Sequence, residues 1–122
     1  MRIDEVCLLT DDVRRLADFY KRLLETENNS SGETHQLILT EGTALTIYND
    51  GTAKNNRNQN VTPAFTVEDM DKEYQKLLSL GARIIEASKR RPWGAVNMSF
   101  YDPDNNMNFF RCFPQNDENP DR

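Results

Sequence analysis

The sequence predicts an α+β protein made of two βαβββ modules, in which a strand and a helix precede antiparallel strands. One order of elements occurs twice: a β-prone segment, an acidic capping residue, an amphipathic helix and further β-prone segments. Residues 49–60 (NDGTAKNNRNQN) contain almost no apolar side chain and separate the two copies. Because a module of this size buries too little surface alone, we expect a single domain whose sheets close around a cleft. The expected boundaries are about 1–49 for module one, 50–60 for the linker, about 61–113 for module two and 114–122 for a frayed tail.

Module one is predicted from a β-prone segment at 3–9 (IDEVCLL) and the helix that follows it. Asp11 is placed to cap that helix, since a carboxylate accepts hydrogen bonds from the first helical amides. The apolar residues of the helix recur at helical spacing, at Val13, Leu16, Ala17, Tyr20, Leu23 and Leu24. Two short strands are expected next, at about 34–40 and 43–48, joined at Glu41-Gly42.

Module two repeats this order. A strand at 61–67 (VTPAFTV) precedes Glu68-Asp69, and Asp69 occupies the place that Asp12 holds in module one. The helical stripe consists of Met70, Tyr74, Leu77 and Leu78, and Gly81 predicts the helix end. Three strands are expected at 82–87, 95–101 and 107–113, with a turn at Asp102-Pro103-Asp104-Asn105 between the last two.

The composition restricts the classes of partner. A formal net charge of −5 and a pI near 4.9 argue against nucleic-acid binding through the net field. The apolar run in MRIDEVCLL is too short for a signal peptide or a membrane span, so we expect a cytoplasmic protein with no membrane contact. Cys7 and Cys112 lie in predicted strands without CxxC spacing, which indicates reduced thiols.

Two groups of residues resemble a known superfamily. They are Asp12 with Phe19-Tyr20 in the first helix, and Trp93-Gly94 followed by Tyr101-Asp102-Pro103-Asp104-Asn105-Asn106. Together with the repeated order of elements, they resemble the vicinal oxygen chelate superfamily: glyoxalase I, bleomycin-resistance proteins and extradiol dioxygenases. The resemblance covers residues 3–113 and implies a curved mixed sheet around a cleft.

In enzymes of that superfamily, four inward-facing positions hold a divalent metal, commonly through His and Glu. The resemblance places these positions at Glu5, Leu45, Thr62 and Phe109. Leucine and phenylalanine have no lone pair to donate, and a threonine hydroxyl is a poor ligand. A slip of one residue brings in Ala44, Thr46, Val61, Pro63, Asn108 or Phe110, none of which is a His, Cys or acid. We therefore expect that the protein holds no metal ion and no cofactor, and we predict no catalytic residue.

Strand alternation, in the registers that the resemblance gives, predicts which side chains line the cleft. They form an apolar and aromatic slot with two charges, and we expect ligand contact from Glu5, Cys7, Leu45, Ile47, Thr62, Phe109 and Arg111. Trp93 and Tyr101 bracket the expected strand at 95–101, and we expect them to contact the ligand at the mouth of the cleft. Each has another reading. Leu45, Ile47 and Phe109 equally suit a filled core, and Glu5 and Arg111 equally suit a structural ion pair.

The function expected from the resemblance is that of a metal-free homodimer that holds a small organic molecule, as bleomycin-resistance-type members do. The acidic charge slightly favours a cationic ligand. One alternative is an enzyme, either a diverged glyoxalase-like lyase, isomerase or dioxygenase, or one that uses Glu5 as a metal-free general base. Another is a non-catalytic interaction module whose cleft is filled by aromatic side chains.

Overall fold

The computed structural model describes residues 1–26, 30–55, 58 and 61–113. The backbone contacts divide the chain into two units, Met1–Asn60 and Val61–Arg122. The expected tail at 114–122 and part of the expected linker lie outside the described residues. No helix in the described part of the chain combines the length and the apolar content needed to cross a membrane.

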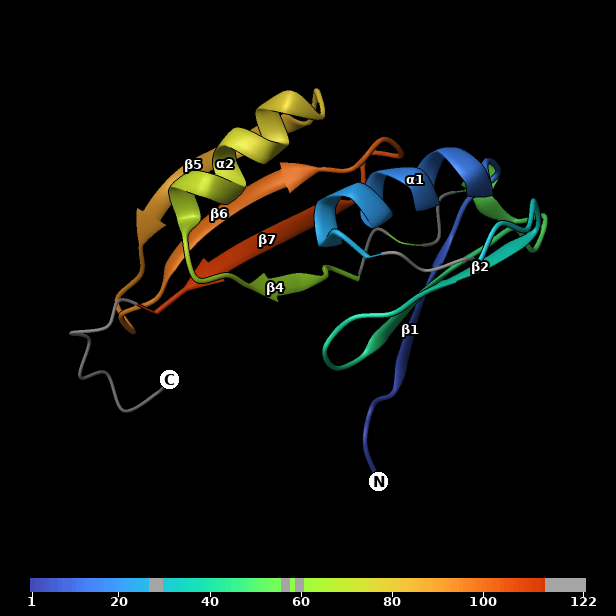
Figure 1. Ribbon diagram of the computed structural model, residues 1–122, viewed down its shortest axis with the longest axis horizontal. Helices are drawn as coiled ribbons and strands as arrows, with labels where there is room; N and C mark the ends of the chain where they lie inside the picture. The colour runs from blue at the N-terminus through green and yellow to red at the C-terminus, as the bar shows by residue number, and fades with distance from the viewer. Residues whose placement is uncertain (27–29, 56–57, 59–60, 114–122) are drawn as a thin grey trace. The chain divides into compact units, whose positions relative to one another are not determined.

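The first unit is a three-stranded sheet with one helix against it (Figure 1). Strand β3 is central, parallel to β1 and antiparallel to β2. Within the described residues this unit has one strand fewer than the βαβββ pattern, and residues 27–29, between α1 and β2, are not described. The elements are β1 (Glu5–Leu9), α1 (Val13–Leu24), β2 (His35–Ile38), β3 (Ala44–Tyr48) and the 3₁₀ turn η1 (Ala53–Asn55).

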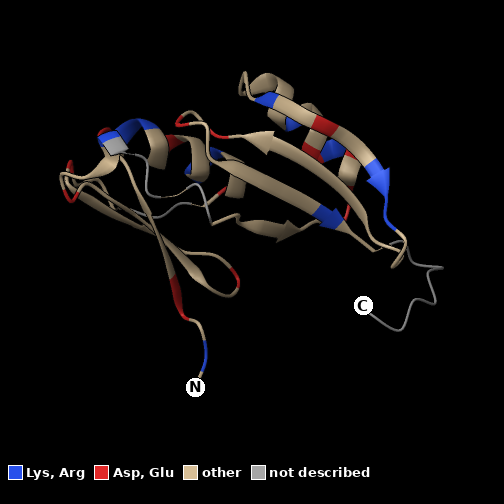
Figure 2. Cartoon of the chain, turned by 180° about the vertical axis from the view of Figure 1, so that it is seen from behind, with Lys and Arg blue, Asp and Glu red and all other residues tan. Residues whose placement is uncertain are grey.

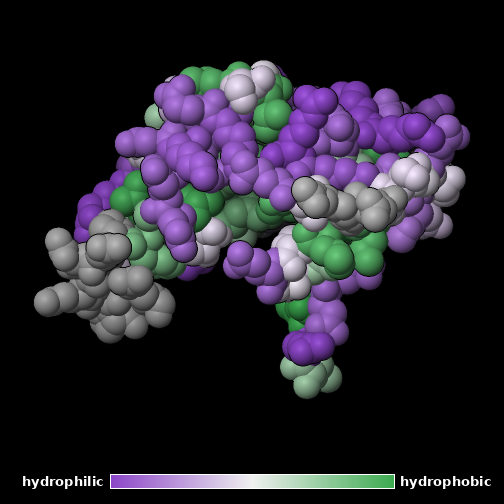
Figure 3. All heavy atoms as spheres, viewed as in Figure 1, coloured by the Kyte–Doolittle hydropathy of each residue, from purple (hydrophilic) through white to green (hydrophobic). Residues whose placement is uncertain are grey.

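Helix α1 begins where a carboxylate caps it. The cap is Asp12, whose side chain accepts a hydrogen bond of 3.2 Å from the Arg15 amide, so the prediction of Asp11 was wrong by one residue. Five of the six predicted stripe residues are buried and Leu24 is half-buried, Phe19 is buried in addition, and hydrophilic residues cover the outer side of the helix (Figure 3). After the helix, Glu25 is in the left-handed conformation with φ 52°.

The second unit is a four-stranded sheet with α2 against one face, in the order β4-β7-β6-β5 (Figure 1). Strand β4 runs parallel to β7, and the other neighbours are antiparallel. This is the βαβββ order that the sequence predicts. The elements are β4 (Ala64–Thr66), α2 (Met70–Ser79), β5 (Arg83–Arg90), β6 (Val96–Tyr101) and β7 (Met107–Cys112).

Both ends of α2 are as predicted. Asp69 caps the start by accepting a hydrogen bond of 3.1 Å from the Lys72 amide, so Asp12 and Asp69 are matching caps. Gly81, with φ 72°, donates to the Leu78 carbonyl, and the Ala82 amide donates to the Leu77 carbonyl. This pair of bonds is a Schellman motif, which needs a left-handed residue where Gly81 stands.

The predicted turn between β6 and β7 is also confirmed. Asn105 has the expected left-handed conformation, with φ 63°. Asp102 is only 3% exposed, and its Oδ1 accepts hydrogen bonds from the amides of Asp104 (2.8 Å) and Asn106 (3.0 Å). Its Oδ2 accepts a third, of 2.8 Å, from Asn106 Nδ2. The carboxylate thus holds the backbone of the turn.

Candidate functional site

Each sheet has a helix face, which carries the buried apolar side chains, and an opposite face. In the first sheet the helix face includes Leu8, Ile38, Leu45 and Ile47, all buried. Residues paired in register point to the same face, so these four belong together: Leu8 pairs with Ile47, and Leu45 pairs with Ile38. The core of the first unit is therefore formed between α1 and this face.

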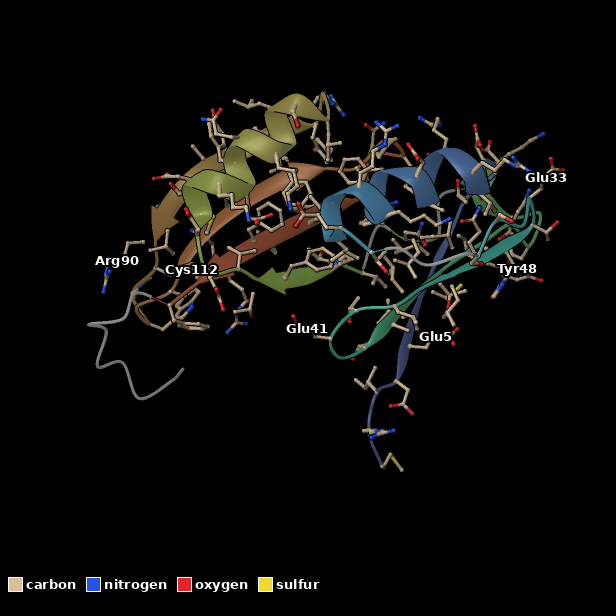
Figure 4. All side chains as sticks on the ribbon, in the orientation of Figure 1. Glu5, Glu33, Glu41, Tyr48, Arg90 and Cys112 are labelled. Atoms are coloured by element: carbon tan, nitrogen blue, oxygen red, sulfur yellow. The ribbon has the colours of Figure 1, made fainter. Side chains whose placement is uncertain are left out.

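The opposite face of the first sheet carries Glu5 and Cys7 from β1, and Thr46 and Tyr48 from β3. Figure 4 shows Glu5 on β1 and Tyr48 at the end of β3. The prediction that Leu45 and Ile47 share a face with Glu5 and Cys7 was wrong by one residue in β3. Burying two large apolar side chains under α1 fixes the facing of that strand, because a slip of one residue reverses every side chain.

Cys7 is exposed and its thiol carries no disulfide. Neighbouring atoms shield the Cys7 thiol from part of the solvent, and this partial desolvation raises its pKa. The negative charges of Glu5 and Asp50 raise that pKa further. A raised pKa keeps the thiol protonated near neutral pH, and the thiolate is the nucleophile. These surroundings do not suit nucleophilic catalysis by Cys7.

The metal positions that the resemblance implies do not fit a divalent ion. Leu45 belongs to the helix face, and Thr62 is exposed and precedes β4. The residue of β3 that shares a face with Glu5 and Cys7 is Thr46, which offers only a hydroxyl. Among the residues that the structure describes, no three His, Cys, Asp or Glu side chains are grouped so that they could hold a metal ion.

In the second sheet the helix face is aromatic. Phe100 and Phe110 are buried with ring centroids 4.7 Å apart, and Met98, which pairs with Phe110, is buried beside them. Leu77 of α2 is fully buried as well. This cluster is the core of the second unit. The alternate residues of the same strands lie on the other face of the sheet.

The opposite face of the second sheet is arranged in three cross-strand rows. The register of β4, β7, β6 and β5 defines them as Thr66–Arg111–Asn97–Lys89, Ala64–Phe109–Ser99–Glu86 and Met107–Tyr101–Arg83. The register confirms the expected common face of Phe109 and Arg111, and it places Tyr101, expected at the mouth of the cleft, on the same face. Asn97, Ser99 and Lys89 were missed, although alternation along β6 from Tyr101 identifies the first two.

Two cation–π contacts and two unpartnered polar atoms define the chemistry of these rows. The Arg83 guanidinium lies 4.6 Å from the centroid of the Tyr101 ring, and the Arg111 guanidinium lies 4.7 Å from that of Phe113. Arg111 Nε and Asn97 Oδ1 are buried without a hydrogen-bond partner among the described residues. Trp93, expected in the site, is 46% exposed in the turn between β5 and β6.

Comparison with known proteins adds a family model and a set of solved structures. A model of the glyoxalase/bleomycin resistance protein/dioxygenase superfamily matches residues 2–110. The chain is similar to a glyoxalase/bleomycin resistance protein/dioxygenase family enzyme from Burkholderia phytofirmans PsJN, with 13% identity and a TM-score of 0.81 over 93% of this chain and 100% of that chain. It is also similar to a glyoxalase/bleomycin resistance protein/dioxygenase from Nocardioides, with 17% identity and a TM-score of 0.75 over 98% and 87% of the two chains. TioX from Micromonospora sp. ML1 has 18% identity and a TM-score of 0.70 over 90% and 97%. At these identities the likeness to the structures shows the fold.

Proposed function

The chain belongs to the glyoxalase/bleomycin resistance protein/dioxygenase superfamily, and on that premise we propose that it binds a small organic molecule without a metal ion. The observation that carries this proposal is the opposite face of the second sheet, where Phe109, Tyr101 and Arg111 lie together. Aromatic surface with a few polar groups is the usual lining of a small-molecule site. Glu5 and Cys7 lie on the opposite face of the first sheet, and ligand contact there stays a prediction of its own.

Binding is favoured over catalysis by the chemistry of the available groups. Glu5 is exposed, whereas a general base is normally held in a shielded position beside its substrate. The raised pKa of Cys7 opposes a nucleophilic role. The donor set at the superfamily's metal positions does not fit a divalent ion.

The proposal includes a homodimer in the cytoplasm. Superfamily members commonly bind small molecules and dimerise. A hydrophobic content of 37% is modest for a chain of 122 residues, and a partner chain would complete the burial. The free thiols of Cys7 and Cys112 are consistent with a reducing compartment.

Native mass spectrometry of the purified protein tests these points together. We expect a species of twice the 14.2 kDa chain mass, with an organic molecule retained in a fraction of it and no stoichiometric metal. A monomer at micromolar concentration would refute the dimer. One bound transition metal per chain would refute the metal-free site and favour the alternative of a diverged lyase or dioxygenase.

A further inference from the structure

One row on the opposite face of the second sheet carries two cationic side chains, Lys89 and Arg111, on either side of Asn97, whose amide offers the donor Nδ2 as well as the acceptor Oδ1. Lys89 of β5 pairs in register with Asn97 of β6, and Asn97 pairs with Arg111 of β7. Neighbouring strands lie about 4.8 Å apart, so Lys89 and Arg111 flank Asn97 with about 10 Å between their backbones. Both side chains are long enough to converge above the Asn97 amide. Figure 2 shows basic residues at the corresponding ends of β5 and β7.

These donors have no anionic partner within the described residues. The side chains of Lys89 and Asn97 make no hydrogen bond or ion pair there, and Arg111 forms no ion pair. Arg111 Nε, one of the two N–H groups with which arginine grips a carboxylate side-on, has no acceptor. A buried donor without an acceptor destabilises the protein, and a bound anion would supply the missing acceptor.

The carboxylate nearest by register is already engaged. Glu86 lies in the adjacent row of β5, and its Oε1 accepts a hydrogen bond of 2.7 Å from Arg91 Nη2. The guanidinium of Arg111 is also held in place, because it stacks on the Phe113 ring. A cation that is oriented beforehand loses less entropy when it binds an anion.

The row next to these donors supplies apolar contact. Phe109 lies beside Arg111 on the same face of the sheet, two residues away along β7, and Ser99 stands next to it on β6. An anionic group above Asn97 would therefore place an attached flat, apolar body over the Phe109 ring. Stacking between two aromatic rings adds affinity beyond that of the buried area alone.

We propose that the row Lys89–Asn97–Arg111 binds the anionic group, carboxylate or phosphate, of a flat organic ligand whose apolar body rests on Phe109. This inference rests on the proposed function, and it reverses the preference for a cation that the net charge suggests. Four probes distinguish a preference for an anion from a preference for a cation. All four contain one phenyl ring: benzoate and phenyl phosphate are anionic, benzyl alcohol is neutral and benzylamine is cationic.

Each probe is titrated into the isotope-labelled full-length protein, and binding is followed by amide NMR shifts. We expect benzoate or phenyl phosphate to shift the amides of Asn97, Phe109 and Arg111, and we expect affinity to fall as salt rises. Lys89→Gln combined with Arg111→Gln should weaken binding of that probe on the order of tenfold or more. Lys72→Gln, an exposed change on α2, is the matched control and should leave affinity unchanged.

The outcomes distinguish the inference from its premise. If benzyl alcohol or benzylamine binds this face as tightly as the anions, the anion row is refuted while small-molecule binding stands. If the double variant retains the parent's affinity for benzoate and phenyl phosphate, the inference is also wrong. If none of the four probes binds at millimolar concentration, the anion-binding row and small-molecule binding at this face are both refuted. The single change Lys89→Gln, at an exposed residue, provides the same comparison should the double variant fail to fold.

Discussion

At the scale of single residues, Cys7 links charge to reactivity. Burial and the charges of Glu5 and Asp50 raise the pKa of its thiol, so a smaller fraction is thiolate than in a free cysteine. Removing one negative charge lowers that pKa toward its ordinary value and increases the thiolate fraction. In a Cys112→Ser background, we expect Glu5→Gln to speed alkylation of Cys7 by iodoacetamide at about pH 8 on the order of twofold.

Mass spectrometry of the modified chain gives this rate. Glu41→Gln removes a negative charge at another exposed position, between β2 and β3, and is the control. Glu41 does not contribute to the pKa of Cys7, so the rate should stay near that of the parent. High salt should reduce the effect of Glu5→Gln, because salt screens exposed charges. Equal rates for both variants at low salt would show that burial alone determines the reactivity of Cys7.

Asp102 stabilises its turn through three hydrogen bonds to a buried carboxylate. Asp102→Ala leaves two backbone amides and the Asn106 side-chain amide without this acceptor, so we expect the free energy of unfolding to fall by about 2–4 kcal/mol. Asp102→Asn keeps one acceptor oxygen and should lose less. Chemical denaturation measures both changes, and an equal loss in the two variants would mean that these hydrogen bonds do not determine the effect.

At the scale of elements, α1 ends on a residue that is poorly suited to its conformation. The amides of Glu25 and Thr26 donate to the carbonyls of Arg22 and Lys21, which forms the same motif that Gly81 makes after α2. A non-glycine residue in the left-handed region costs about 1–2 kcal/mol, whereas glycine adopts it freely at some cost in unfolded-state entropy. Glu25→Gly should therefore raise the free energy of unfolding by about 0.5–1 kcal/mol.

The control for this change is Glu25→Ala, which removes the same side chain but keeps the steric cost of a Cβ. Thermal unfolding should show a higher midpoint for Glu25→Gly than for Glu25→Ala. A gain in both variants would indicate that the glutamate side chain itself, and not the backbone conformation, is unfavourable at this position.

Elements with a strong internal pattern were predictable from the sequence. Helix α1 runs from Val13 to Leu24, as its apolar spacing indicates, and Asp69 and Gly81 bound α2 as expected. The expected strand at 61–67 shortens to β4 at Ala64–Thr66. Pro63, just before it, has no backbone N–H to contribute to a ladder, although its carbonyl accepts a bond of 2.9 Å from the Phe109 amide.

The candidate site was predictable only where alternation is uninterrupted. Phe109 and Arg111 are two apart in the regular strand β7, so their common face follows from the sequence. The register of β5 against β6 shifts between Ile84 and Glu86 and again between Glu86 and Lys89. Each shift breaks the alternation, so the sequence could not place Lys89 beside Asn97. In β3 alternation correctly groups Leu45 with Ile47, but the register that the resemblance gives assigned this pair to the cleft and not to the helix face.

At the scale of the whole molecule, net charge and local charge point in different directions. The formal charge of −5 sets the long-range field and weakly favours cations. At contact distance the groups within a few ångströms dominate, because solvent and salt screen the rest. Lys89 and Arg111 therefore decide the preference of the second sheet, although the chain as a whole is acidic.

Asn58, in the connection between the two units, is hydrogen-bonded to the first sheet. Asn58 is 6% exposed, and its Oδ1 accepts a hydrogen bond of 3.1 Å from the Leu9 amide. Its Nδ2 donates one of 2.7 Å to the Leu9 carbonyl. Strand β1 is an edge of the sheet, so Asn58 occupies backbone groups that would otherwise lack a partner strand. Asn58 is 49 residues from Leu9 in the sequence. Its side-chain amide bonds the backbone N–H and C=O of Leu9 as the backbone of a neighbouring strand would.

Asn58→Ala removes both hydrogen bonds and exposes the edge of β1 at Leu9. We expect the Leu9 amide to exchange its hydrogen faster, on the order of tenfold or more, because its protection then depends on local opening at an unpaired edge. Amide exchange by NMR measures this rate, with the amide of Phe110 in the second sheet as the internal reference. Lys54→Ala, an exposed change in the same connection, should leave the rate at Leu9 unaltered. If Asn58→Ala speeds exchange at Leu9 and Phe110 equally, the loss is global and Asn58 does not act as a local clamp. If neither rate changes, the two hydrogen bonds contribute nothing to holding the connection against β1.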